Sequence, residues 1–185
     1  NRLGHGQLNM LQAFGKSCNP YFINLMQQVG GEKLYDMAVT LGFDRPIVLA
    51  EGLKTARAVL PTEEDLRSPA EVANLSFGQG SLLATPVHMA QLVGTVVNGG
   101  ELVRPTLYRG TVDKDGILQE AAPTAPQHAF SENTAAILRQ MMAYTIEEGT
   151  GTKAKPIEGG AGAKTGTAET GWEEMDKICT NERGR

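Results

Sequence analysis

The sequence is poor in the residues on which several common kinds of site depend. Only two of its 185 residues are cysteines, Cys18 and Cys179. Two cysteines are too few for a disulfide framework, and without a Cys-x-x-Cys pair there is no cysteine-based metal motif. The histidines His5, His88 and His128 are scattered, and none falls in a His-Glu-x-x-His pattern. We interpret them as surface or structural residues, and we expect no metal and no organic cofactor.

Basic charge and long apolar segments are also scarce. The chain has 17 Lys and Arg against 21 Asp and Glu, a formal net charge of −4, and no run of basic residues. This balance argues against a nucleic-acid partner, because proteins that bind nucleic acids neutralise phosphates with clustered Lys and Arg. No apolar run approaches the ~20 residues that a membrane span needs, and no signal peptide is visible.

What the chain does contain fits one domain with a single core. Hydrophobic residues make up 41% of the sequence, and the length lies within the roughly 100–200 residues of an ordinary domain. Apolar residues recur at helical spacing in several segments, and a strand-like stretch with a Lys-Asp-Gly turn predicts one hairpin within 101–121. Residues 43–66 are interpreted as an irregular connection. The predicted helix starts are Asn19, Ser68, Thr85 and Ser131.

Two familiar motifs are excluded by the residues at one or two of their positions. A phosphate-binding loop needs glycines where this chain has Glu158 and Ala163, ahead of Lys164-Thr165. A nucleophile elbow needs a final glycine, but the segment Gly15-x-Ser17-x-Asn19 ends in asparagine. That segment also follows a predicted helix, whereas the elbow follows a strand.

Two short segments remain as candidate sites. Ser17-Cys18-Asn19 presents a hydroxyl and a carboxamide just before a helix, and Lys164-Thr165-Gly166-Thr167 presents an ammonium, two hydroxyls and an open glycine backbone. In an extended strand, the two threonines would point to the same face, and the glycine would let a ligand approach closely. Taken singly, each has a plainer explanation, as an ordinary helix start before proline and as an ordinary loop.

Their combination resembles a known family. Ser-x-Asn followed well downstream by Lys-Thr-Gly gives two of the three signatures of the penicillin-recognising serine acyltransferases. The order of further motifs over residues 1–171 is similar to that of the penicillin-binding protein transpeptidase domain, in its class B branch. These motifs are Gly78-Gln79-Gly80, Thr85-Pro86, Asn98-Gly99-Gly100, Arg104-Pro105 and Gly149-Thr150-Gly151-Thr152.

The resemblance implies a fold and its extent. We expect an α+β chain with part of the transpeptidase and β-lactamase-like fold. It would hold mostly the helical lobe, a small hairpin and the single Lys-Thr-Gly strand of an incomplete antiparallel sheet. Residues 1–171 would then be a partial penicillin-binding transpeptidase domain, and residues 172–185 a polar tail of unclear origin.

The resemblance also implies a reaction and its ligands. Such enzymes cross-link peptidoglycan stem peptides that end in D-Ala-D-Ala, through a serine acyl-enzyme, and β-lactams acylate the same serine. The parent protein would be anchored at the outer face of the cytoplasmic membrane and would work with a glycosyltransferase partner. Two alternatives stay open: a β-lactam sensor domain, and a catalytically silent scaffold in a cell-wall synthesis complex.

Roles for individual residues follow from the same resemblance. Ser17 would relay protons toward the leaving amine, and Asn19 would hydrogen-bond the substrate's peptide group. Lys164 would supply positive potential and orient Ser17, so the two should lie side by side across the cleft. The residues implied in substrate binding are Thr165, Gly166 and Thr167. The two threonine hydroxyls would hold the terminal carboxylate, and the Thr167 N–H would be one oxyanion-hole donor.

The sequence departs from the family at its first signature, Ser-x-x-Lys. The five serines, at positions 17, 68, 76, 81 and 131, are followed three residues later by Pro, Glu, Gln, Ala and Thr. The acylated serine, its lysine base and the second oxyanion donor are therefore missing from these 185 residues. The residues after Gly171 show no strand pattern. We expect the chain to be part of a longer transpeptidase and, by itself, to be marginally stable, aggregation-prone and inactive.

Overall fold

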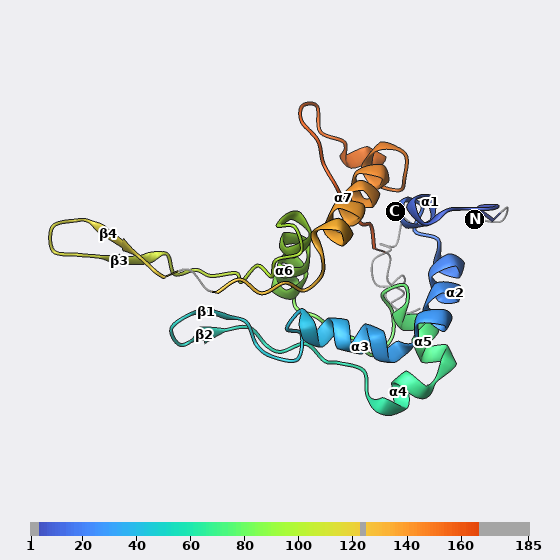
Figure 1. Cartoon of the computed structure of the whole chain (residues 1–185), viewed down its shortest axis with the longest axis horizontal. Helices are drawn as coiled ribbons and strands as arrows, with labels where there is room; N and C mark the ends of the chain where they lie inside the picture. Colours follow the sequence, from blue (N-terminus) through green and yellow to red (C-terminus); the bar gives the residue numbers. More distant parts are fainter. Residues whose placement is uncertain (1–3, 123–124, 167–185) are drawn as a thin grey trace, which may run out of the picture.

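The computed structural model describes residues 4–122 and 125–166 (Figure 1). Helices dominate the described part, and two short antiparallel hairpins accompany them, which confirms the predicted α+β class. The helices are α1 (Met10–Gly15), α2 (Asn19–Val29), α3 (Gly31–Thr40), α4 (Glu63–Arg67), α5 (Pro69–Leu75), α6 (Pro86–Val97), α7 (Glu132–Glu147) and the 3₁₀ helix η1 (Thr152–Ala154). The strands are β1 (Val48–Ala50), β2 (Leu53–Lys54), β3 (Gly110–Val112) and β4 (Leu118–Glu120).

Three of the four predicted helix starts are confirmed. The side chains of Ser68, Thr85 and Ser131 each accept a hydrogen bond from a backbone N–H in the first turn of α5, α6 and α7. The prediction for α2 is wrong by one residue. Cys18 occupies the N-cap without a side-chain capping bond, and Asn19 is the first helical residue. Its carboxamide is therefore not the helix cap.

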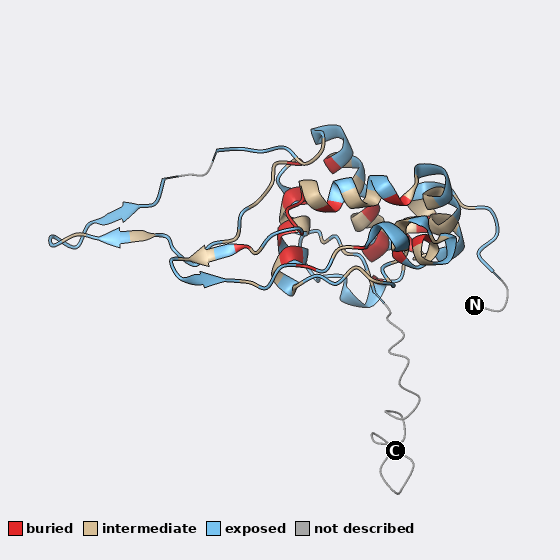
Figure 2. Cartoon of the chain, turned by 90° about the horizontal axis from the view of Figure 1, so that it is seen from below, coloured by how far each residue is buried: buried red, intermediate tan, exposed pale blue. Residues whose placement is uncertain are grey.

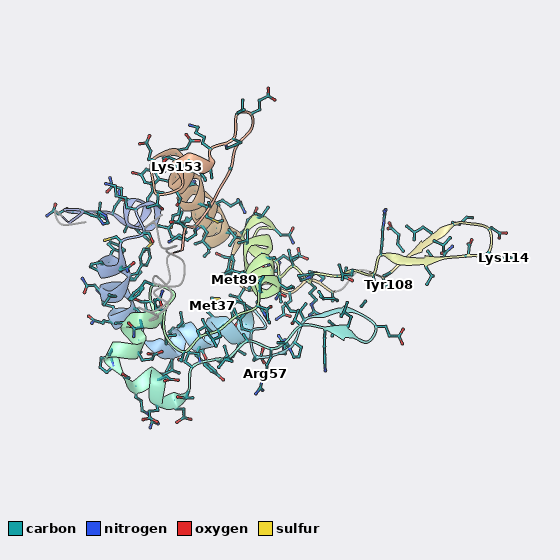
Figure 3. All side chains as sticks on the ribbon, turned by 180° about the vertical axis from the view of Figure 1, so that it is seen from behind. Met37, Arg57, Met89, Tyr108, Lys114 and Lys153 are labelled. Atoms are coloured by element: carbon teal, nitrogen blue, oxygen red, sulfur yellow. The ribbon has the colours of Figure 1, made fainter. Side chains whose placement is uncertain are left out.

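The predicted hairpin is confirmed as β3 and β4, paired in the register Gly110↔Glu120, Thr111↔Gln119 and Val112↔Leu118. It extends away from the helices and is largely exposed (Figure 2). Lys114 lies at its tip and Tyr108 near its base (Figure 3). A second hairpin, of β1 and β2, lies in the segment predicted to be irregular. Strands of three and two residues are too short to show an alternating pattern.

Helix α4 was also missed, although the sequence holds a signal for it. Thr62 and Asp65 form a capping box, in which each side chain accepts the other residue's backbone N–H. This Thr-x-x-Asp spacing is a variant of the Ser/Thr-x-x-Glu pattern. The carboxylate also accepts the Thr62 hydroxyl, and these bonds lower the pKa of Asp65.

A cluster of buried hydrophobic residues lies around the end of α3. Ala38, Leu41, Phe43 and Ala58 form this cluster, and side chains from α6 and from the segments before and after it pack around them. His88 of α6 is fully buried beside Phe43, with ring centroids 5.2 Å apart. Its Nδ1 lies 2.7 Å from the Thr85 hydroxyl and its Nε2 lies 3.2 Å from the Arg45 carbonyl oxygen. His88 is thus a structural histidine, as the sequence predicted.

Close backbone contacts hold α1 against α7. A Cβ atom at Gly15 would overlap the ring of Tyr144, and one at Gly149 would overlap the carbonyl group of Gly15. The Thr150 N–H donates to the Gly15 carbonyl oxygen at 2.9 Å. Two glycines therefore let the end of α1 sit directly on the end of α7, which fixes the position of the turn that follows α1.

The expected Lys-Thr-Gly strand is not formed in the described residues. Residues 161–166 have no regular secondary structure, and they run beside α7, where the Ala163 N–H donates to the Met142 carbonyl oxygen at 3.0 Å. A strand needs a neighbour for its backbone hydrogen bonds, and the described strands pair only within their own hairpins. Thr167 and the segment 172–185 lie outside the described residues.

Candidate active site

The turn between α1 and α2 carries the first candidate segment. Helix α1 ends at Gly15, and the Ser17 and Cys18 N–H groups donate back to Phe14 and Ala13. Ser17 has a φ of +50°, a left-handed conformation that is uncommon for residues other than glycine. This turn places Ser17 and Asn19 in the lining of one cleft. Strained backbone of this kind is concentrated at functional sites.

Lys164 brings the second candidate segment to the first. Its Nζ donates to the Ser17 Oγ at 2.9 Å and to the Thr165 carbonyl oxygen at 2.8 Å. Its ammonium also lies 5.7 Å from the centroid of the Phe14 ring. The predicted proximity of Ser17 and Lys164, 147 residues apart in the chain, is therefore present in the structure.

Thr165 is linked to the turn after α1 through Thr150, a residue to which the sequence analysis assigned no role. Its Oγ1 lies 2.6 Å from the Thr150 Oγ1. Thr150 in turn contacts the Gly15 carbonyl oxygen, two residues before Ser17. Thr150 stands in the Gly-Thr-Gly-Thr motif, but nothing in that motif indicates which side chain it touches. Only the tertiary structure reveals this contact.

Both candidate segments line a cleft with a volume of about 690 Å³. One part of its wall is polar and comes from Ser17, Asn19, Lys164, Thr165 and Gly166. Three phenylalanines, Phe14, Phe22 and Phe77, also line the cleft. A further apolar part of the wall comes from α6 and α7. Its members are Met89 (labelled in Figure 3), Leu92, Val93, Val96, Leu138 and Met142. A hydroxyl held by an ammonium, beside an open glycine backbone, suits an anionic ligand and a proton transfer.

Lys164 should lose its proton at a lower pH than free lysine. Partial burial lowers the pKa of Lys164 from the ordinary 10.5, because removing water disfavours the charged ammonium. Between the lowered pKa and 10.5, the folded chain binds fewer protons than the unfolded chain. The free energy of unfolding should therefore rise with pH in that window. A Lys164→Met variant should lose this rise.

An NMR titration of the Lys164 side chain measures this pKa directly. A midpoint at or above 10.5 would contradict the expectation. The free energy of unfolding, measured at several pH values for the unaltered protein and for Lys164→Met, gives the second measurement.

Groups of metal-binding side chains and free thiols are two further features that bear on the chemistry open to the described residues. Within 4–122 and 125–166, no group of three or more His, Cys, Asp or Glu side chains is arranged to hold a metal ion. Cys18 is a buried free thiol at the N-cap of α2, between the two residues that face the cleft.

Comparison with known proteins agrees with this arrangement. The protein family described as Penicillin binding protein transpeptidase domain matches residues 1–182. The chain is 32% identical over 171 residues to Stage V sporulation protein D of Bacillus subtilis, covering 91% of this chain and 26% of that protein. It is 32% identical over 165 residues to Peptidoglycan D,D-transpeptidase PbpA of Mycolicibacterium smegmatis, covering 89% and 33%. The chain thus spans about a quarter to a third of these relatives.

Solved structures show the same fold. The D,D-transpeptidase domain of a peptidoglycan glycosyltransferase from Eggerthella lenta superposes with a TM-score of 0.78 at 29% identity, over 90% of this chain and 43% of that one. PBPA from Mycobacterium tuberculosis superposes with a TM-score of 0.75 at 27% identity, over 95% and 40%. With a family match over nearly its whole length, this chain belongs to the penicillin-binding protein transpeptidase domain family.

Proposed function

We propose that this chain supplies one wall of the active site of a peptidoglycan D,D-transpeptidase. The observation that carries the proposal is the 2.9 Å contact from Lys164 to Ser17 at the edge of the cleft. The acylated serine and its lysine base would come from the rest of the protein, because no serine in these 185 residues is followed by lysine at the third position. The 185-residue chain alone would then be inactive.

The contact supports a direction of proton transfer. An ammonium group can only donate, so the Ser17 oxygen accepts from Lys164 and the hydroxyl proton remains free. In acyl transfer, the bond between the carbonyl carbon and the leaving nitrogen breaks, and that nitrogen needs a proton. We assign this proton to Ser17, and the Lys164 ammonium that donates to the Ser17 oxygen would return a proton to it and become neutral.

The remaining polar groups would bind the substrate. The Asn19 carboxamide can donate to and accept from a peptide group, and the Thr165 hydroxyl can donate to the terminal carboxylate. Gly166 leaves the backbone open to the described part of the chain, since none of the described residues has an atom within 4 Å of the place a Cβ would take. Thr167, proposed as a second carboxylate contact and an oxyanion-hole donor, lies outside the described residues.

The names of the relatives favour the enzyme over a sensor or a scaffold. Several are called peptidoglycan D,D-transpeptidases. One matched structure, penicillin-binding protein A from M. tuberculosis at a TM-score of 0.74, is an imipenem acyl-enzyme complex. By analogy, D-Ala-D-Ala stem peptides would be the substrate and β-lactams the inhibitors.

The cellular setting is part of the same proposal. We place the parent protein at the outer face of the cytoplasmic membrane, where it would act with a glycosyltransferase. Among the described residues, no helix has both the length and the apolar character needed to cross a membrane.

Covalent labelling tests the proposed function. The full-length protein should gain one penicillin adduct in an intact-mass measurement and should release D-Ala from a pentapeptide stem. The 185-residue chain should gain no adduct. Acylation without D-Ala release would favour the β-lactam sensor, and the absence of both from the full-length protein would favour the scaffold.

A further inference from the structure

Thr150 lies outside the cleft and contacts both candidate segments, at Thr165 and at Gly15 just before Ser17. Its backbone N–H donates to the Gly15 carbonyl oxygen at 2.9 Å, and its hydroxyl lies 3.3 Å from the same oxygen. The shorter contact of that hydroxyl is with the Thr165 Oγ1, at 2.6 Å. Thr150 is absent from the lining of the cleft, whereas Thr165 is part of it. Any effect of Thr150 on a ligand would therefore pass through Thr165.

The two hydroxyls have only two protons, so their directions are coupled. In one arrangement, Thr150 donates to Gly15 and Thr165 donates to Thr150, which leaves only lone pairs of Thr165 facing the cleft. In the other, Thr150 donates to Thr165, and the Thr165 proton is free to point into the cleft. A carboxylate is an acceptor only and would be repelled by the first arrangement.

The change from the first arrangement to the second breaks only a weak hydrogen bond to the Gly15 carbonyl oxygen. The hydroxyl contact that must be given up is 3.3 Å long, beyond the usual range for an O–H···O hydrogen bond. The Gly15 oxygen keeps its 2.9 Å bond from the Thr150 N–H in both arrangements. A hydroxyl that accepts one hydrogen bond is also a stronger donor for the next, because chains of hydrogen bonds polarise one another.

We propose that Thr150 is a positioning residue for carboxylate binding. When the carboxylate of a stem peptide or a β-lactam enters the cleft, Thr150 donates to Thr165 and turns the Thr165 proton toward it. This inference rests on the proposed function, because it takes Thr165 as a carboxylate contact. It adds a residue outside the cleft on which the strength of that contact depends.

Two substitutions at this position separate the hydroxyl from the backbone contact. Thr150→Val keeps the branched shape and the N–H bond to Gly15 but removes the hydroxyl, whereas Thr150→Ser restores the hydroxyl. Thr111→Val, at an exposed threonine of β3 far along the chain from the cleft, is the matched control.

The measurement is acylation of the full-length protein by penicillin G and by its methyl ester, which lacks the carboxylate charge. We expect Thr150→Val to lower the second-order rate constant roughly three- to tenfold for penicillin G, the size of the neutral hydrogen bond by which Thr150 orients and polarises the Thr165 hydroxyl. The loss should lie in the binding constant before acylation and not in the acylation step at saturation. The methyl ester should lose less than about twofold, by the same reasoning, since it offers no charge to this contact. Thr150→Ser and Thr111→Val should behave like the unaltered protein.

Each other outcome is decisive. Equal losses for penicillin G and its ester, or no loss for penicillin G, would overturn the role of Thr150 and leave the proposed function standing. Failure of the unaltered protein to be acylated by penicillin G would overturn the proposed function, and this inference with it.

Discussion

Replacing Ser17 by alanine should lower the acylation of the full-length protein by penicillin by roughly 10²–10⁴-fold, the usual contribution of a positioned acid–base group. The Ser17 hydroxyl is the group that Lys164 holds at 2.9 Å, and its free proton is the one assigned to the leaving nitrogen. Without the Ser17 hydroxyl, the nitrogen must leave unprotonated or take its proton from a water molecule. Stopped-flow or competition kinetics with a fluorescent penicillin would measure the second-order rate constant.

Two further variants separate chemistry from folding. Ser17→Gly also removes the hydroxyl, but glycine accepts the φ of +50° without steric cost, so it should be as slow as Ser17→Ala while at least as stable. Ser131→Ala removes a helix-capping hydroxyl outside the cleft, at a cost of about 1 kcal/mol in stability, and should acylate normally. Rapid acylation of either Ser17 variant would show that the proton comes from elsewhere.

Replacing Gly149 by alanine should lower the free energy of unfolding by about 3 kcal/mol, at the upper end of what overpacking usually costs. The added Cβ would overlap the carbonyl oxygen of Gly15 and lie 2.8 Å from the Thr145 Cα. Both neighbours are backbone, so no side-chain rotation relieves the contact, and α1 must move away from α7. The measurement is equilibrium unfolding in urea.

Gly160→Ala is the matched control for this prediction. Within residues 4–122 and 125–166, nothing lies within 4 Å of the Cβ it would add, and its φ is not in the left-handed region. Its stability should stay within about 0.5 kcal/mol of the original, as for most surface substitutions. If Gly149→Ala were equally silent, the close packing of α1 on α7 would not be needed to hold the turn that carries Ser17.

Much of the local structure could be predicted from the residues in each segment. Ser68, Thr85 and Ser131 begin helices because their side chains accept backbone N–H groups within the same turn. The 101–121 hairpin follows from its turn and strand-forming residues. Cys18, and not Asn19, caps α2, because the exact end of a helix depends on the backbone direction that the preceding turn imposes.

By itself, then, the sequence determined most of the helices but not α4, and it also determined the main hairpin, the family resemblance and the identity of the two candidate segments. Only the tertiary structure decided that the Lys164 ammonium donates to the Ser17 hydroxyl and that Thr150 stands between Gly15 and Thr165. The physical reason is the separation along the chain between the groups that interact. Caps and turns act within a few residues, whereas the Thr150–Gly15 and Lys164–Ser17 contacts join groups 135 and 147 residues apart. Glycines at the ends of α1 and α7 let the two helices approach closely enough for the first of these contacts.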